Sequence, residues 1–257
     1  MTTPIFRKSR RDAPAGFFAC EAAGLRWLAE AAARGGAPVV EVVDVAEDHL
    51  DLVRLTGVPP SRDAALAFGR GLARTHDAGA PAFGSPPPGW GRDGFFGPLD
   101  APLVMAAGEH ERWGEFLARR RLEPLAAALD RGGVVPATAF DALVVRLLAG
   151  DLDDDDRPAR LHGDLWSGNV LWTPAGATLI DPAAQGGHRE TDLAMLHLFG
   201  LRHLDAVVAG YEEVHPLRPG WRGRLGLHQV YPVGVHALLF GGGYVARLRE
   251  LLDRWAH

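Results

Sequence analysis

The pattern of apolar positions divides the chain into a short strand-containing part and a longer helical part. Residues 4–9 (PIFRKS) predict a strand, and residues 13–36 predict a helix that a Gly-Gly pair terminates. Two further strands are predicted at 38–45 and 49–55, with a turn between them. We assign this small lobe to residues 1–56.

Helical periodicity dominates the rest of the chain, residues 57–257, which we assign to a second and larger lobe. Residues 56–60 are expected to link the two lobes, and a Pro- and Gly-rich loop is expected between Gly79 and Asp100. Ser61 is a good N-cap for the first helix of this lobe. The predicted helices cover 62–79, 109–130, 138–148 and the region from Thr191 onward.

One carboxylate stands on the apolar face of the helix at 13–36. At helical spacing, Glu21 shares this face with Phe17 and Leu25. A buried carboxylate is costly unless a cation meets it. The pattern therefore predicts a cationic partner for Glu21.

Composition excludes several classes of protein. The 257 residues are 47% hydrophobic and 23% charged, which is ordinary for a soluble globular protein. A net charge of -5 gives no general attraction to nucleic acid or to anionic membranes. The uncharged run 225–246 contains His, Gln, Pro and Gly, which argues against membrane insertion. The single cysteine, Cys20, forms no internal disulfide, so we expect a cytoplasmic protein.

The segment LHGDLWSGNVLW, residues 161–172, contains several side chains that can bind metal or transfer protons. His162, Asp164 and Asn169 lie in this segment, and the apolar run TLIDPA places Asp181 shortly after it. A hairpin is predicted between 170–173 and 178–181, with Gly176 suited to a positive φ. The hairpin would bring Asp181 back to Asn169.

This arrangement suits phosphoryl transfer. Asn169 and Asp181 offer hard oxygen ligands for Mg²⁺ bound with substrate phosphates, and Asp164 is then free to accept a proton from an attacking hydroxyl. The spacing matches a kinase catalytic loop, with Asn five residues after the Asp, and His162 would brace the loop. Lys8 is the expected partner of Glu21 and the expected phosphate-binding lysine.

Other polar features favour structural interpretations. The run DLDDDD (151–156) is expected to be a solvated loop, and His76 a structural residue at a helix end. Gly241 to Gly243 follow no predicted strand and are not expected to bind phosphate.

The sequence LHGDLWSGN, residues 161–169, resembles the fructosamine kinase (ketosamine-3-kinase) family, a branch of the protein-kinase-like fold. FRKS, FFACEAAGLRWL, GFFGPL, WGEFLARRRLEP, IDPAAQGGHRETDLAMLHLFG and HALLFGGGY extend the resemblance over most of the chain. It implies an α+β protein-kinase-like fold and ATP-dependent phosphorylation of the sugar 3-hydroxyl of ketosamines, small molecules or glycated proteins.

The resemblance also implies roles for individual residues. Asp164 would be the catalytic base, Asn169 and Asp181 would bind Mg²⁺, and Lys8 with Glu21 would orient ATP. Glu190 and Asp192 match a segment expected to brace the catalytic loop. The candidates for the sugar pocket are Trp166, Trp113 and His188.

The sequence departs from the family before Lys8. Family members have two strands and a glycine-containing loop over the phosphates there, whereas seven residues without glycine precede Lys8 in this sequence. We expect the reading frame to continue upstream, and otherwise an exposed sheet edge beside Lys8.

Several functions stay open from the residues alone. The acceptor could be another amino-sugar, an aminoglycoside or a free sugar alcohol. The missing phosphate loop is compatible with a non-catalytic nucleotide-binding pseudokinase. A metal-dependent hydrolase would instead use His162, Asp164, Asp181 and His188, with the histidines on the metal.

Overall fold

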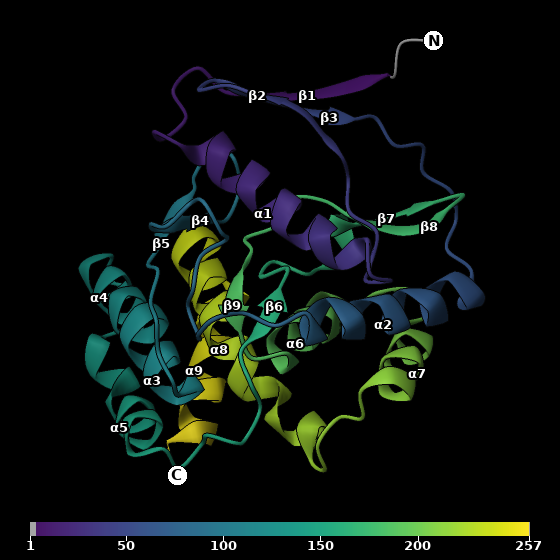
Figure 1. The fold of residues 1–257 in the computed structure, drawn as a ribbon. Coiled ribbons are helices and arrows are strands. Elements are labelled where there is room, and N and C mark those ends of the chain that lie inside the picture. The colour runs from purple at the N-terminus through teal and green to yellow at the C-terminus, as the bar shows by residue number, and fades with distance from the viewer. Residues whose placement is uncertain (1–3, 257) are drawn as a thin grey trace.

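The structure, a computed structural model, describes residues 4–256. Its first sheet contains β1 (Ile5–Ser9), β2 (Val42–Val45) and β3 (His49–Val53), all antiparallel, in the order β1-β3-β2. Figure 1 shows this sheet at the top of the molecule, with α1 (Phe17–Ala32) beneath it. The predicted strands and the predicted helix of the first lobe are therefore confirmed. Within the described residues β1 is an edge strand, as expected.

A small apolar core joins α1 to the sheet. Leu50 and Leu52 of β3 are buried on the side of the sheet that faces α1. Because side chains alternate along a strand, His49 and Asp51 point to the opposite face. The α1 face that carries Phe17 and Leu25 completes this core, and Glu21 is buried with it, as the helical spacing predicts.

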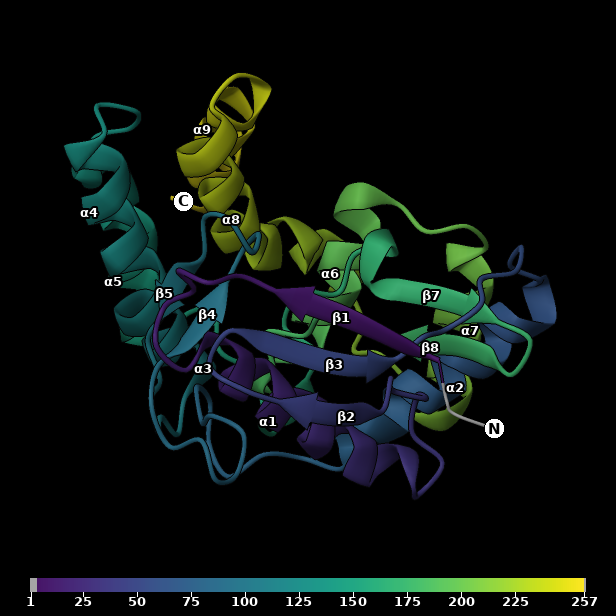
Figure 2. The ribbon, with the colours of Figure 1, turned by 90° about the horizontal axis from the view of Figure 1, so that it is seen from above.

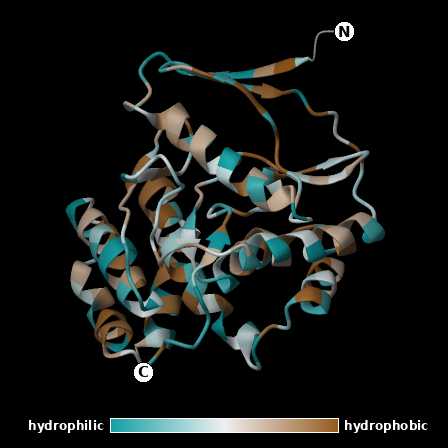
Figure 3. Ribbon diagram, viewed as in Figure 1, coloured by the Kyte–Doolittle hydropathy of each residue, from teal (hydrophilic) through white to brown (hydrophobic). Residues whose placement is uncertain are grey.

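The second lobe is built from helices. Figure 2 looks down on the first sheet, with the helices around and behind it, and Figure 3 shows each helix with hydrophobic and hydrophilic bands, as expected of helices with one buried face. Ser61 caps α2 as predicted, accepting a hydrogen bond from the amide of Ala64 at 3.1 Å. The helices of this lobe are α2 (Arg62–Asp77), α3 (Trp113–Leu117), α4 (Glu123–Arg131), α5 (Asp141–Ala149), α6 (Glu190–Phe199), α7 (Leu204–Val214), α8 (Trp221–Phe240) and α9 (Gly243–Trp255).

The single helix predicted over 109–130 is α3 and α4 joined by a π-helical turn at Ala118–Leu122. The helix predicted over 138–148 corresponds to a 3₁₀ turn (Ala137–Phe140) followed by α5. The uncharged run 225–246 is split between α8 and α9 by Gly241 and Gly242, which adopt positive φ angles. Among residues 4–256, no helix has the length and apolar character needed to cross a membrane.

Three two-stranded ladders complete the fold. The predicted hairpin is β7 (Val170–Thr173) with β8 (Gly176–Leu179), and Gly176 has the expected positive φ, at 115°. Sequence periodicity did not predict β4 (Gly94–Phe96), β5 (Leu103–Met105), β6 (Ala159–Leu161) or β9 (Gln185–Gly187). Strands of three residues are too short to show an alternating pattern, and β4 lies in the segment expected to be a loop.

Two glycines allow α2 and α7 to cross at close range. A Cβ atom on Gly69 would lie 1.9 Å from the carbonyl oxygen of Val207, and one on Gly210 would lie 2.0 Å from that of Leu66. Each helix backbone therefore occupies the space that a side chain on the other would need. This contact fixes α2, which carries His76, against the rest of the lobe.

We predict that Gly69→Ala lowers the free energy of unfolding by about 1–3 kcal/mol, because the two helix backbones must separate. The matched control is Gly223→Ala in α8, where an added Cβ meets no atom within 4 Å. The control should leave stability unchanged or raise it by about 0.5–1 kcal/mol through helix propensity. Urea denaturation of both variants measures the difference, and equal stabilities would contradict the close-packing interpretation.

Candidate active site

A cavity of about 530 Å³ opens between the first lobe and the catalytic-loop region of the second. Polar side chains gather on one part of its wall, and aromatic and aliphatic side chains cover the rest. The polar residues are Lys8, Glu21, Asp164, Asn169 and Asp181, five of the residues selected from the sequence.

Lys8 and Glu21 form an ion pair at the roof of this cavity. The Lys8 Nζ atom lies 2.8 Å from Glu21 Oε2 and 3.5 Å from Asp181 Oδ1. One ammonium group therefore pairs with a carboxylate of α1 and with a carboxylate that follows β8. Burial raises the pKa of Glu21 to about 6, against the lowering effect of Lys8. The other oxygen, Glu21 Oε1, is buried without a hydrogen-bond partner among the described residues.

The candidate catalytic loop, residues 162–169, is anchored by Asp192 of α6. The Asp192 carboxylate accepts hydrogen bonds from the backbone amides of His162 at 2.8 Å and Gly163 at 3.0 Å. Gly163 has a φ of 83°, and a Cβ atom there would lie 2.0 Å from the carbonyl oxygen of Ala183. Only glycine fits this close approach.

His162 braces the loop, as predicted. The ring Nε2 atom lies 2.9 Å from the carbonyl oxygen of Ile180, and Nδ1 lies 3.2 Å from the amide nitrogen of Asp164. An amide must donate and a carbonyl must accept, so the ring is neutral with its proton on Nε2. Burial lowers the pKa of His162 in agreement with this state.

Asn169 connects the two aspartates of the site. Its amide nitrogen, Nδ2, donates to the backbone oxygen of Asp164 at 2.8 Å, to Asp164 Oδ2 at 3.2 Å and to the backbone oxygen of Asp181 at 3.3 Å. With the nitrogen engaged in this way, Oδ1 is the atom left to bind a metal ion. Burial raises the pKa of Asp164 to about 7 despite the hydrogen bond from Asn169.

The β7–β8 hairpin places Asp181 beside Asn169. The amide of Ile180 donates to the backbone oxygen of Asn169 at 3.1 Å, which closes the end of the β7–β8 ladder. Asp181 follows with a φ of 52°, a left-handed conformation that aspartate tolerates better than most residues. The carboxylate is 43% exposed, so it remains available within the cavity.

His76 and Tyr211 extend the support of the catalytic loop, and the sequence did not reveal this role. His76 Nε2 lies 3.1 Å from Asp192 Oδ2, and its Nδ1 lies 2.8 Å from the Tyr211 hydroxyl. All three side chains are buried. The position of His76 on the buried face of α2, one residue after Thr75, was the available signal.

An aromatic wall lies opposite the polar residues. Trp166, Phe199, His236, Phe240 and Tyr244 line the cavity, and neighbouring rings lie 5.0–6.4 Å apart. Gly168 permits this arrangement, because a Cβ atom there would lie 2.3 Å from the Trp166 ring. Sequence reasoning selected Trp166 and missed His236, which lies in the segment HALLFGGGY.

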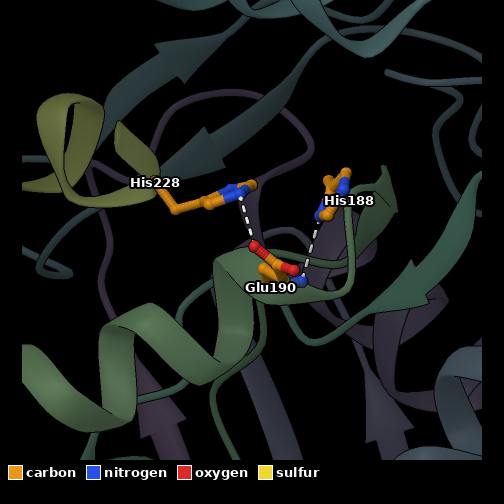
Figure 4. Close-up of side chains that lie close together, drawn as sticks. All are labelled: His188, Glu190 and His228. Atoms are coloured by element: carbon orange, nitrogen blue, oxygen red, sulfur yellow. Dashed lines mark hydrogen bonds and ion pairs between the residues drawn. The ribbon is translucent and has the colours of Figure 1, made fainter. Parts of the chain in front are cut away.

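Trp113 and His188, the other candidates for the sugar pocket, do not line this cavity. Both are buried beside a second cavity of about 30 Å³, where Trp113 packs on His188 and His228. Figure 4 shows His188 and His228 on either side of Glu190. The spacing of His188 to the 162–169 segment gave no indication that its side chain lies outside the main cavity.

Glu190 also differs from expectation. Its carboxylate lies 2.5 Å from an Arg224 nitrogen and 3.4 Å from His228 Nε2, and no hydrogen bond joins it to the catalytic loop within residues 4–256. Of the two acidic residues of this segment, Asp192 alone therefore contacts the loop directly.

The acidic run 151–156 is more than a solvated loop. Asp153 accepts a hydrogen bond from the amide of Gly114 at 2.6 Å. Asp154 lies 3.2 Å from His188 Nε2, and Asp156 lies 2.8 Å from Arg189 Nε. His188 and Arg189, which contact the run, lie between β9 and α6, too far along the chain to be inferred from the run itself.

A hydrolase centre is not supported by this geometry. Both ring nitrogens of His162 contact backbone atoms, and His188 does not line the main cavity. A metal held by these histidines together with Asp164 and Asp181 would require the loops to rearrange.

The comparison with known families decides the identity of the fold. A profile described as fructosamine kinase matches residues 2–257. The chain belongs to the fructosamine kinase family. A relative from Synechocystis, named a probable ketoamine kinase, is 34% identical over 240 residues, which span 92% of this chain and 78% of the relative.

Solved structures agree with this assignment. A Thermobifida fusca protein, provisionally named a fructosamine-3-kinase, is similar with a TM-score of 0.88 and 42% identity, over 99% of this chain and 85% of that one. A choline/ethanolamine kinase family protein from Mesorhizobium loti shares the fold with a TM-score of 0.52 and 17% identity, over 98% and 85% of the two chains. The chain therefore has the α+β protein-kinase-like fold that the fructosamine kinase family shares with these kinases.

We predict that Asp164→Asn becomes more stable relative to the wild-type protein as the pH rises from about 4 to about 7. The pKa of Asp164 is about 7 in the folded protein, above its ordinary value of 3.8. Between these values the folded state binds more protons than the unfolded state, so this carboxyl makes stability fall as pH rises. The asparagine variant lacks this contribution.

Urea denaturation at several pH values measures the difference in free energy of unfolding. Asp253→Asn, a substitution at an exposed carboxylate of α9, is the control and should show no such trend. A constant difference between Asp164→Asn and wild type over this pH range would show that Asp164 ionises normally.

Proposed function

We propose that this protein is an ATP-dependent kinase that phosphorylates the sugar 3-hydroxyl of ketosamines. Family membership supports a kinase acting on fructosamines. The observation that carries the proposal is the meeting of Lys8, Asp164, Asn169 and Asp181 at one wall of a cavity whose other wall is aromatic. The resulting metabolism would be deglycation of proteins or use of Amadori products in the cytoplasm.

The residues present fit a nucleotide with Mg²⁺. Lys8 is held by Glu21 beside Asp181, where its ammonium can meet phosphate oxygens. Asn169 Oδ1 and Asp181 offer the two protein oxygens that Mg²⁺ commonly takes alongside phosphate. When bound, Mg²⁺ would neutralise the negative charge that develops on the phosphates. The division into a nucleotide-binding lobe, 1–56, and a catalytic lobe, 57–257, belongs to this proposal.

Asp164 would accept the proton of the attacking hydroxyl. It lies near the start of a loop braced by His162 and Asp192, and Asn169 donates a hydrogen bond to its carboxylate at 3.2 Å. A base whose pKa is near neutrality is well matched to proton transfer at physiological pH. Burial keeps competing water away from the carboxylate and supplies this match.

The aromatic wall would bind the acceptor. Trp166 is 41% exposed and offers a ring face on which a sugar or an amine substituent can pack. His236 Nδ1 donates a hydrogen bond to the carbonyl oxygen of Pro232 at 2.8 Å, so Nε2 is the ring nitrogen left to contact the acceptor. A hydroxyl of the acceptor is a suitable donor.

We predict that the purified protein transfers phosphate from ATP to a ketosamine, and that Asp164→Ala lowers this rate by about 10²–10⁴-fold, as expected for loss of a general base. Mass spectrometry of a panel of ketosamines, aminoglycosides and free sugar alcohols gives the acceptor class. Asp253→Ala is the matched control and should retain full activity.

Phosphorylation of aminoglycosides or sugar alcohols in preference to every ketosamine would replace the proposed acceptor. ATP binding without phosphorylation of any member of the panel would favour the pseudokinase. If Asp164→Ala turns over within a few fold of wild type, Asp164 is not the base.

We also predict that Mg²⁺ strengthens ATP binding in the wild-type protein and much less in Asp181→Ala. The reason is that one carboxylate contributes a large share of the protein ligands when only one or two are present. Isothermal titration calorimetry with and without Mg²⁺ measures the enhancement, with Asp253→Ala as the control. An equal Mg²⁺ enhancement in wild type and Asp181→Ala would remove Asp181 from the metal site.

A further inference from the structure

A row of charged side chains crosses the outer face of the first sheet, away from α1 and from the active-site cavity. Arg7 of β1 is paired in register with Asp51 of β3, and Asp51 is paired in register with Asp44 of β2. Figure 2 looks onto this face of the three strands. Like charges directly opposite each other destabilise a sheet unless a cation lies between or beside them.

Arg7 neutralises only part of this row. Its guanidinium binds Asp51 through two hydrogen bonds, at 2.7 and 2.6 Å. Asp44 and Asp48 add two further carboxylates close to the same guanidinium. Three carboxylates therefore share one guanidinium on this face.

His49 points an unused nitrogen into the cluster. Its Nδ1 lies 2.8 Å from Asp48 Oδ1 and donates a hydrogen bond to this carboxylate. The Nε2 atom is buried and has no hydrogen-bond partner among the described residues. The nearest acidic atom is Asp44 Oδ2, at 3.6 Å, too far for a hydrogen bond.

These atoms have the composition of a metal site. One ligand atom each from Asp44, His49 and Asp51 lies within 4.8 Å of the others. A histidine whose second nitrogen donates to a carboxylate is the usual form of a metal-binding histidine. Zn²⁺ binds nitrogen and carboxylate oxygen at about 2.0–2.2 Å. The Asp44 side chain is 66% exposed and can rotate toward a shared ion, while Asp51 keeps spare lone pairs beside Arg7.

We propose that Asp44, His49 and Asp51 form a binding site for one divalent transition-metal ion, of which Zn²⁺ is the best match. The ion supplies positive charge to a row in which three carboxylates share one guanidinium, and it gives His49 Nε2 a partner. It ties β2 to β3 at the turn that joins them. The mixed nitrogen and oxygen ligands separate this site from the oxygen-only Mg²⁺ site proposed in the cavity.

The buried cluster of His188, Glu190 and His228 is a weaker candidate for the same ion. His188 Nδ1 accepts the amide of Glu190 at 3.2 Å, and its Nε2 faces Asp154. The Arg224 guanidinium already neutralises Glu190. That cluster lacks both the unpartnered nitrogen and the excess negative charge.

Calorimetric titration of the nucleotide-free, tag-free protein with Zn²⁺ tests the proposal. We expect one Zn²⁺ per chain, with affinity reduced at least a hundredfold in His49→Gln and in Asp44→Asn. Asp48→Asn, which removes only the partner of Nδ1, should weaken binding about 10–100-fold. The matched control is His215→Gln, since His215 pairs with Asp77 on the surface without a third ligand.

Co²⁺ replaces Zn²⁺ in a parallel titration, and its visible absorption should show a coordinated nitrogen that His49→Gln abolishes. Thermal melting of each variant establishes that it is folded. Zn²⁺ binding that survives in folded His49→Gln and Asp44→Asn would overturn the proposal and direct attention to the His188 cluster or the cavity. Absence of binding by the wild-type protein at millimolar Zn²⁺ would also overturn it.

Discussion

The active site depends on one buried carboxylate, that of Asp192. The side chain has no solvent exposure, and burial of a charge is costly unless hydrogen bonds replace its water. The amides of His162 and Gly163 and the ring of His76 supply them. These bonds fix the start of the loop, and Asp164 follows directly after the two anchored residues. The backbone of Gly163 also packs so closely on the carbonyl oxygen of Ala183 that no side chain fits at position 163.

The polar wall of the cavity is short of positive charge. Lys8 is the cation that reaches Glu21 and Asp181, while Asp164 lies nearby with only an amide as its hydrogen-bond partner. The positive charge nearby does not offset the burial of the carboxyl groups, since the pKa of Glu21 is raised to about 6 and that of Asp164 to about 7. A bound cation would offset this shortage, which is a physical reason for proposing Mg²⁺ together with a nucleotide at this site.

Local spacing explains what the sequence could predict. The helical position of Glu21, the Asp164-to-Asn169 interval and the β7–β8 hairpin each depend on residues close together in the chain. The roles of His76, Tyr211 and His236 were not predicted, because their contacts depend on tertiary packing. His76 contacts Tyr211, 135 residues away in the sequence, and Asp192, 116 residues away. Trp113 and His188 do not line the main cavity, and His188 directly follows a three-residue strand, β9. No periodic pattern reports such a strand.

The direct test is a crystal structure with a non-hydrolysable ATP analogue and Mn²⁺ in place of Mg²⁺. We expect the phosphates beside Lys8, the Mn²⁺ anomalous signal between Asn169 Oδ1 and Asp181, and the Asp164 carboxylate facing the terminal phosphate across an open space for the acceptor. Nucleotide bound elsewhere, or Mn²⁺ held by residues other than Asn169 and Asp181, would contradict the assignment of this cavity to phosphoryl transfer.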